Sequence, residues 1–156
     1  MGRRLMWVFV FSTSIVGAAA YVGDVPATPA SGFAGTTLAV GRFGDIDVAN
    51  HVPKGPSDLY VQSNVWAPGG TTGWHTHPGH SLIIVTAGTV TAYEGDDPSC
   101  TPHVYTAGMG FVDPGGDHVH VLRNEDSIEA RTIAVQLIPA GATRRIDAES
   151  PAACPF

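Results

Sequence analysis

The sequence carries little positive charge. Lysine and arginine together account for 8 of the 156 residues, and Lys54 is the single lysine. No run of basic residues is present, which argues against nucleic acid or an anionic membrane surface as a partner. Acidic residues number 14, so the formal net charge is −6.

The sequence also lacks a sustained helical period and a long apolar run. Leu5 to Val16 is uncharged and mostly apolar, and this run is shorter than the about 20 residues that a transmembrane helix needs. Arg3 and Arg4 precede this stretch and Ala18-Ala19-Ala20 follows it, which is the pattern of an export signal with a small-residue cleavage site. An uncleaved membrane anchor is the alternative, and the arginine pair also weakly resembles a twin-arginine signal.

Removal of residues 1–20 as a signal peptide leaves 136 residues with a formal charge of −8. The mature protein is then expected to be secreted or extracytoplasmic, in the periplasm or cell envelope, with no membrane partner. Residues 21–35 are rich in Pro, Gly, Ala, Ser and Thr and are predicted to be a flexible leader. Residues 36–156 are long enough for a single domain with one core.

Cysteine is scarce, with Cys100 and Cys154 as the two examples. An even number of cysteines in an exported chain favours a disulfide. Such a bond would tie the tail 151–156 to the loop 96–102 and stabilise the fold by roughly 3–4 kcal/mol. A redox or metal-binding thiol is the alternative, which is disfavoured because neither cysteine lies near a histidine cluster in the sequence.

The sequence does contain a series of short segments rich in β-branched and aromatic residues. Gly, Pro, Asp or Asn separates each segment from the next. About eight strands at this spacing predict an all-β sandwich or barrel. The predicted strands are 37–40, 59–66, 81–86, 89–93, 103–106, 111–112, 119–123 and 130–138.

Histidines are concentrated in two clusters. His75 and His77 are two residues apart, and His118 and His120 repeat this spacing about forty residues later. Residues i and i+2 of a strand point to the same face, so each pair can direct two imidazoles toward one point. Imidazole is the commonest metal ligand in proteins, and the two clusters therefore predict a shared metal site. The alternative is that they are ordinary polar residues on the wet face of a strand.

Two longer patterns enclose these clusters. The first pattern resembles the first conserved motif of the cupins: Gly69, five residues, His75-Thr76-His77, three residues, Ser81, six residues and Gly88. The second pattern resembles the second cupin motif: Gly108, five residues, Pro114-Gly115-Gly116, then His120, three residues and Asn124. The resemblance implies a small antiparallel jelly-roll (cupin) barrel with a metal inside. It also implies His75, His77 and His120 as the metal ligands.

The chain departs from the cupin pattern at two places. Ser81 stands where the family usually carries a metal-binding glutamate, and one extra residue separates Gly116 from His120. The extra residue leaves His118 open as a fourth ligand or as a catalytic acid/base. We therefore expect one divalent transition metal without an acidic partner, with open positions typical of a catalytic site. Fe, Cu, Zn and Mn all remain compatible with such ligands.

Weaker candidates for the pocket are polar and aromatic residues that alternate along the neighbouring predicted strands. Ser81 is expected to point inward together with Ile83 and Val85, whereas His80 is expected at the rim. The candidates are Ser81, Tyr60, Gln62, Asn64, Trp66 and Gln136.

Three functions fit these features. The resemblance implies first a dioxygenase-like oxidoreductase acting on a small organic substrate. A non-catalytic extracytoplasmic protein that binds a metal or a small ligand is the second. A metal-free sugar isomerase or epimerase is the third, and it is disfavoured because arginine and lysine are scarce. Small-molecule binding is common to all three, and a homodimer is expected by analogy with the family.

Overall fold

The computed structural model describes residues 27–43 and 55–156, and every regular element within these ranges is a strand. The predicted export signal, residues 1–20, lies outside the described residues, as does most of the predicted leader. None of the described segments forms a helix with the length and apolar character needed to cross a membrane.

The described residues form ten strands that pair antiparallel throughout. All eight predicted strands are confirmed and correspond to β1, β2 and β4 to β9, although β8 begins at His120, one residue later than predicted. Two further strands, β3 and β10, are two residues long and carry no detectable pattern. The bounds are β1 Ser31–Phe43, β2 Ser57–Thr71, β3 His75–Thr76, β4 Ser81–Ala87, β5 Thr89–Glu94, β6 His103–Thr106, β7 Gly110–Asp113, β8 His120–Arg123, β9 Ala130–Pro139 and β10 Ile146–Asp147.

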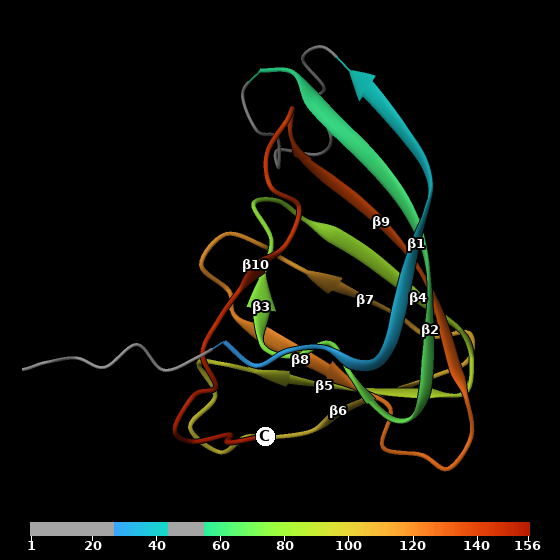
Figure 1. The fold of residues 1–156 in the computed structure, drawn as a ribbon, viewed down its shortest axis with the longest axis vertical. Helices are drawn as coiled ribbons and strands as arrows, with labels where there is room; N and C mark the ends of the chain where they lie inside the picture. Colours follow the sequence, from blue (N-terminus) through green and yellow to red (C-terminus); the bar gives the residue numbers. More distant parts are fainter. Residues whose placement is uncertain (1–26, 44–54) are drawn as a thin grey trace, which may run out of the picture.

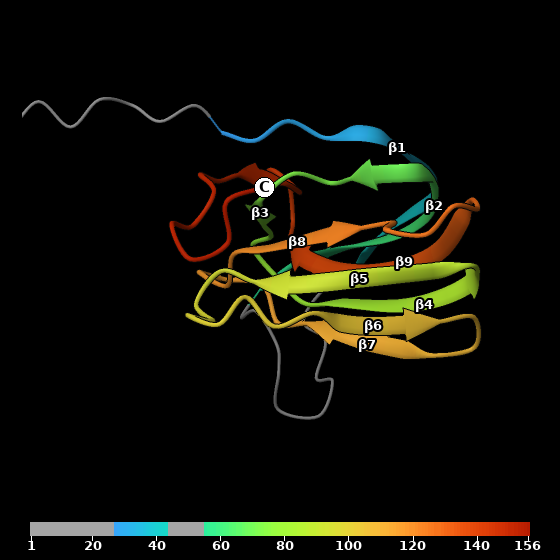
Figure 2. The same cartoon turned by 90° about the horizontal axis from the view of Figure 1, so that it is seen from below.

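The strands form two halves that face each other across the core. One half has the order β1-β2-β9-β4-β7, and the other has the order β6-β5-β8-β3-β10. Thr71 of β2 pairs with Arg123 of β8 and joins the halves along one edge. Figure 1 shows the long strands β1, β2, β9 and β4 curving over the shorter β3, β8 and β5, and Figure 2 shows the same layers from below. This arrangement confirms the predicted all-β jelly-roll barrel.

The first strand begins earlier than the sequence predicts. Strand β1 starts at Ser31, so the predicted leader 21–35 overlaps it by five residues. The segment is poor in strand-forming residues, but its backbone pairs with β2 from Ser31 onward. Phe33 adds an anchor, because its ring centroid lies 4.5 Å from that of Trp66. Pairing and this aromatic contact outweigh a weak local propensity.

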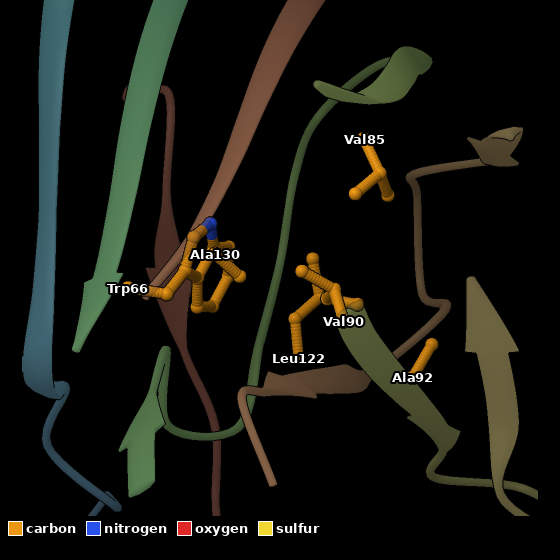
Figure 3. Packing of buried hydrophobic residues seen from close by; sticks show 6 residues of the cluster. All are labelled: Trp66, Val85, Val90, Ala92, Leu122 and Ala130. Carbon is orange, nitrogen blue, oxygen red and sulfur yellow. The ribbon is translucent and has the colours of Figure 1, made fainter. Parts of the chain in front are cut away.

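The main apolar core lies between the two halves. Strand β4 alternates strictly, with Ser81, Ile83 and Val85 buried and the residues between them exposed. The inward orientation predicted for these three residues is therefore confirmed. Figure 3 shows the side chains that meet here from β2, β4, β5, β8 and β9. The buried cluster consists of Trp66, Val85, Val90, Ala92, Leu122 and Ala130.

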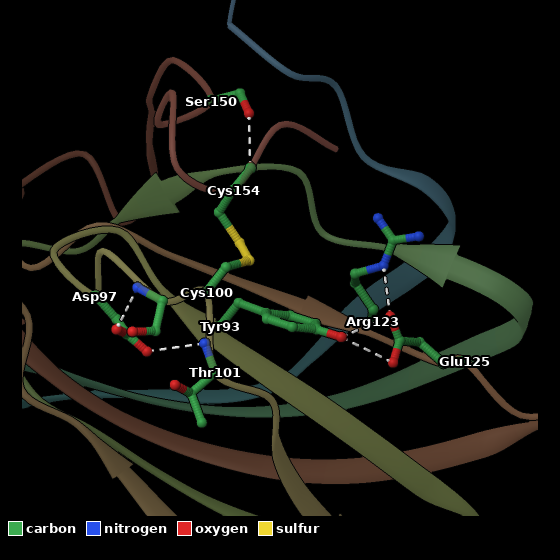
Figure 4. The surroundings of a disulfide bond; sticks show 9 residues. Tyr93, Asp97, Cys100, Thr101, Arg123, Glu125, Ser150 and Cys154 are labelled. Carbon is green, nitrogen blue, oxygen red and sulfur yellow. Dashed lines mark hydrogen bonds and ion pairs between the residues drawn. A yellow bond between two sulfur atoms is a disulfide. The ribbon is translucent and has the colours of Figure 1, made fainter.

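A second cluster attaches the C-terminal tail to the barrel. Cys100 and Cys154 form a disulfide with a Cα–Cα distance of 5.3 Å, which confirms the predicted bond. Figure 4 shows this disulfide above Tyr93, whose hydroxyl donates a hydrogen bond to Glu125. The ring of Phe156 packs edge-on against Tyr93, with the centroids 4.7 Å apart. The tail is therefore a packed part of the fold.

Candidate metal centre

Three histidines from two distant segments meet inside the barrel. His75 in β3 and His120 in β8 are direct cross-strand partners, and His77 follows β3. One ligand atom from each histidine lies within 4.8 Å of the other two, an arrangement able to hold a metal ion. His75 and His120 are each 4% exposed, and the side chain of His77 is 12% exposed. The structure thus brings together the three residues that the sequence singled out.

Backbone carbonyls set the orientation of two of these rings. His75 Nδ1 lies 2.9 Å from the carbonyl oxygen of Gly73, and His77 Nδ1 lies 2.6 Å from that of Arg144. A carbonyl oxygen only accepts, so each Nδ1 carries the proton and each Nε2 keeps its lone pair for a metal. Gly73 has φ +68°, and a Cβ there would overlap the carbonyl oxygen of Thr28. Glycine is therefore required at the turn that orients His75.

The site holds its histidines neutral at pH 7. Burial lowers the pKa of His75 well below its ordinary value, and the nearby His120 and Arg145 lower it further. Burial likewise lowers the pKa of His120 to about 4. Burial lowers the pKa of His77, partly offset by the Arg144 carbonyl and by Asp113. Because a metal binds only the neutral imidazole, the three rings are ready to coordinate without first losing protons.

Asp113, at the end of β7, places a carboxylate beside these histidines. Its Oδ1 lies 3.6 Å from His120 Nδ1, and its Oδ2 lies 3.7 Å from His77 Nε2. The side chain is 5% exposed. This finding corrects the expectation of a site without an acidic partner. The sequence does place Asp113 directly before Pro114-Gly115-Gly116, but only the pairing of β7 with β4 turns it toward the histidines.

His118 does not join the three central histidines. It lies in the turn before β8, and its Nε2 is 2.5 Å from Oε2 of Glu94. Its ring centroid is 6.0 Å from that of His120, and its side chain borders a separate surface pocket beside Asp96 and Glu149. His118 contacts Glu94 and is not among the residues that line the central cavity. The geometry therefore gives no support to His118 as a fourth ligand or as an acid/base at this site.

The three histidines open into a small central cavity of about 70 Å³. Four of the five predicted polar pocket residues line it, and Trp66 does as well. Tyr60 does not line the cavity; its ring centre lies 5.8 Å from Cζ of Arg144, which does. The predicted residues that line the cavity are Ser81, Gln62, Asn64, Gln136 and Trp66.

Two arginines complete the cavity wall, and neither is marked by a signal in the sequence. Arg144 and Arg145 lie between β9 and β10, where no strand pattern or motif marks them. Arg145 donates hydrogen bonds to the carbonyl oxygen of Thr72, at 2.7 Å, and to Asp147, at 2.6 Å. Arg144 donates to Oε1 of Gln62. Two cationic side chains therefore share the cavity wall with Asp113 and with neutral polar and apolar side chains.

Comparison with known proteins finds a family model that matches the segment around the site. The cupin domain model matches residues 65–136, which include both motifs and all three histidines. The polyketide cyclase RemF from Streptomyces resistomycificus is 17% identical, covers 81% of this chain and 80% of its own, and has a TM-score of 0.55. A cupin domain from Bordetella pertussis Tohama I is 18% identical over 72% of this chain and 97% of its own, with a TM-score of 0.48. Residues 65–136 therefore form a cupin domain.

Other comparisons add little beyond the fold. An oxalate oxidase solved with the substrate analogue glycolate is 21% identical over 81% of this chain and 58% of its own, with a TM-score of 0.48. A search of curated proteins finds no match. Because one fold hosts many reactions, the function is argued below from the site.

Proposed function

We propose that this protein holds one divalent transition metal on His75, His77 and His120. The observation that supports the proposal is the convergence of three buried histidine ligand atoms within 4.8 Å. Two further buried atoms, His120 Nδ1 and Asp113 Oδ2, have no hydrogen-bond partner. Buried polar atoms are normally satisfied, and a bound cation would satisfy these. The residues present thus fit a metal.

We propose further that the metal centre serves a dioxygenase-like oxidation of a small organic substrate. A bound transition metal would supply Lewis-acid and redox chemistry at the centre of the cavity. The chain itself limits what can enter, because the cavity of about 70 Å³ is well below the roughly 300–1,000 Å³ of sites for drug-sized ligands. The substrate is therefore a molecule of few non-hydrogen atoms.

Arg144 favours a substrate that carries a negative charge. No carboxylate pairs with Arg144 within residues 27–43 and 55–156, although its guanidinium borders the cavity. A half-buried guanidinium is well suited to bind a carboxylate in a bidentate manner. Gln62, to which Arg144 donates a hydrogen bond, keeps the guanidinium in place. A small organic acid is the substrate class that these groups favour.

Metal binding is tested by titrating metal-free protein with Zn²⁺ in a calorimeter. We expect one site per chain in the wild type and loss of that site in His77→Ala. The matched control is His103→Ala, which removes an exposed histidine at the start of β6. An unchanged site in His77→Ala, or equal losses in both variants, would overturn the proposed metal centre.

Turnover is tested by oxygen uptake with iron-, copper- and manganese-loaded protein and a panel of small carboxylic acids. We expect consumption of oxygen with at least one acid and none with the corresponding amides. Arg144→Gln should raise KM more than it lowers kcat, because it removes a binding contact. Metal binding without turnover of any acid would instead favour the non-catalytic binding protein.

We also propose that the protein is exported. Residues 1–20 have the pattern of a signal peptide, and the disulfide between Cys100 and Cys154 is consistent with an oxidising, extracytoplasmic location. Amino-terminal sequencing of protein from the native host tests the proposal. A mature terminus near Tyr21 is expected, and an intact Met1 on cytoplasmic protein would contradict it.

A further inference from the structure

The position that usually carries the cupin glutamate is occupied by Ser81, yet a carboxylate lies directly opposite it. Ser81 is the first residue of β4 and Asp113 the last of β7, and their Cα atoms are paired in the antiparallel register. Directly opposed residues of an antiparallel pair project from the same face, with their Cβ atoms about 4.5–5.5 Å apart. A side chain from either strand can therefore reach the same part of the cavity.

Ser81 itself is engaged elsewhere. Its hydroxyl oxygen accepts a hydrogen bond from Nε2 of Gln136 at 3.0 Å, and it brings no negative charge to the site. The carboxylate of Asp113 is held by one hydrogen bond, in which the backbone N–H of Gly115 donates to Oδ1 at 2.9 Å. Gly115 has φ +68°, and a Cβ there would overlap the carbonyl oxygen of Gly79. The backbone is thus shaped to fix this aspartate.

The second oxygen of Asp113 is buried without a partner. Oδ2 makes no hydrogen bond, although it lies 3.7 Å from His77 Nε2, the nitrogen that keeps its lone pair for a metal. Arg144 and Arg145 border the same cavity, but neither forms an ion pair with Asp113 among the described residues. A buried carboxylate oxygen without compensation is costly. The carboxylate of Asp113, beside one nitrogen of His77 and one of His120, is placed where a metal ligand would lie.

We infer that Asp113 supplies the carboxylate ligand of the metal centre, in place of the glutamate that is absent at position 81. This inference rests on the proposed metal centre and extends its ligand set to three histidines and one aspartate. A hard oxygen donor beside three imidazoles suits iron, manganese or zinc better than it suits a soft-ligand copper(I) site. The carboxylate has moved from one strand to its neighbour while still facing the same cavity.

The experiment compares zinc affinity in four chains: wild type, Asp113→Asn, Asp113→Ala and the double variant Ser81→Glu/Asp113→Ala. We expect Asp113→Asn and Asp113→Ala each to weaken zinc binding by about 100-fold, at the upper end of the range for groups that support a metal site. The double variant should regain affinity to within about tenfold of the wild type, because glutamate at 81 restores the carboxylate. Circular dichroism of each metal-free variant checks that the barrel has folded.

A crystal structure of the zinc-loaded wild type separates a ligand from a positioning residue. We expect an Asp113 oxygen at roughly 2.0–2.2 Å from the ion. An aspartate that stays outside bonding distance and only contacts the rings of His77 or His120 would overturn the inference, as would unchanged affinity in Asp113→Asn. Retention of zinc by His75→Ala would instead defeat the proposed metal centre itself, so the two failures are distinguishable.

Discussion

At the scale of the residue, the protonation of each imidazole determines whether a histidine can bind a metal. The carbonyl oxygens of Gly73 and Arg144 fix the protons of His75 and His77 on Nδ1, while burial keeps all three rings neutral. Each neutral ring is a ready ligand, but each also makes the metal-free fold sensitive to acid.

The stability of the metal-free protein is predicted to fall between pH 6.5 and pH 4. Burial lowers the folded-state pKa of His120 from 6.5 to about 4, so in this window the unfolded chain binds more protons than the folded one. The free energy of unfolding therefore decreases as the pH falls, with His120 alone contributing about 3 kcal/mol at most. Urea unfolding at a series of pH values measures it.

The control for this pH dependence is His103→Ala, which removes an exposed histidine and should leave the profile unchanged. His120→Gln should make the decrease smaller, because one of the three buried histidines that gain a proton on unfolding is gone. A wild-type free energy of unfolding that stays constant from pH 7 to pH 4.5 would contradict the account.

Asn124 is predicted to be a structural residue, although it belongs to the second cupin motif. It is fully buried, and its Nδ2 lies within hydrogen-bond distance of the carbonyl oxygens of Trp66, Ala67 and Ile128, at 2.7 to 3.2 Å. Asn124→Ala leaves these acceptors without their donor, so we expect a loss of about 2–4 kcal/mol in the free energy of unfolding. Urea denaturation measures this, with the exposed Ser127→Ala as control. A loss equal to that of the control would show that the hydrogen bonds are unimportant.

At the level of elements, the C-terminal tail depends on one covalent bond and a small aromatic cluster. Cys154 is fully buried with Trp74, Tyr93 and Val121, and the ring of Phe156 stacks on Trp74 at 6.3 Å between centroids. The tail thus covers the barrel next to the segment that leads into His75.

Loss of the disulfide is predicted to destabilise the fold without removing the metal centre. The bond closes a chain separation of 54 residues, for which the entropy model gives about 4 kcal/mol, and measured losses are usually about 2–5 kcal/mol. Cys100→Ser/Cys154→Ser should therefore unfold at lower urea yet still bind one zinc ion per chain. Wild type in reducing agent is the control, and it should behave like the variant. Equal stability of oxidised and reduced wild type would contradict the prediction.

The strands were predictable to different degrees for physical reasons. Strand β4 is a seven-residue segment rich in β-branched and apolar residues, a composition that predicts a strand directly. Strand β3 has two residues, so it has no period, and its conformation comes from pairing with β8 and β10. The early start of β1 at Ser31 likewise depends on its partner β2. The local sequence therefore predicts a strand only where the strand is long enough to show a characteristic composition or spacing.

Over the whole molecule, the histidines were predictable and their surroundings were not. Spacing and resemblance identified His75, His77 and His120, because each pair of motif residues lies close together in the sequence. Asp113 reaches the same cavity through the pairing of β7 with β4, and Arg144 reaches it from a loop without a motif. Such long-range pairings are set by topology. His118 has the same spacing to His120 as His75 has to His77, but it lies against Glu94, a contact that the sequence does not reveal.

The central claim is that imidazoles from two distant segments share one metal ion. Elemental analysis of the protein, purified from its native host without chelator or added metal, tests it most directly. The account predicts about one transition-metal ion per chain in the wild type and almost none in a variant carrying His75→Ala and His120→Ala. A metal-free wild type that also fails to bind added Zn²⁺, Fe²⁺ or Mn²⁺ while correctly folded would contradict it.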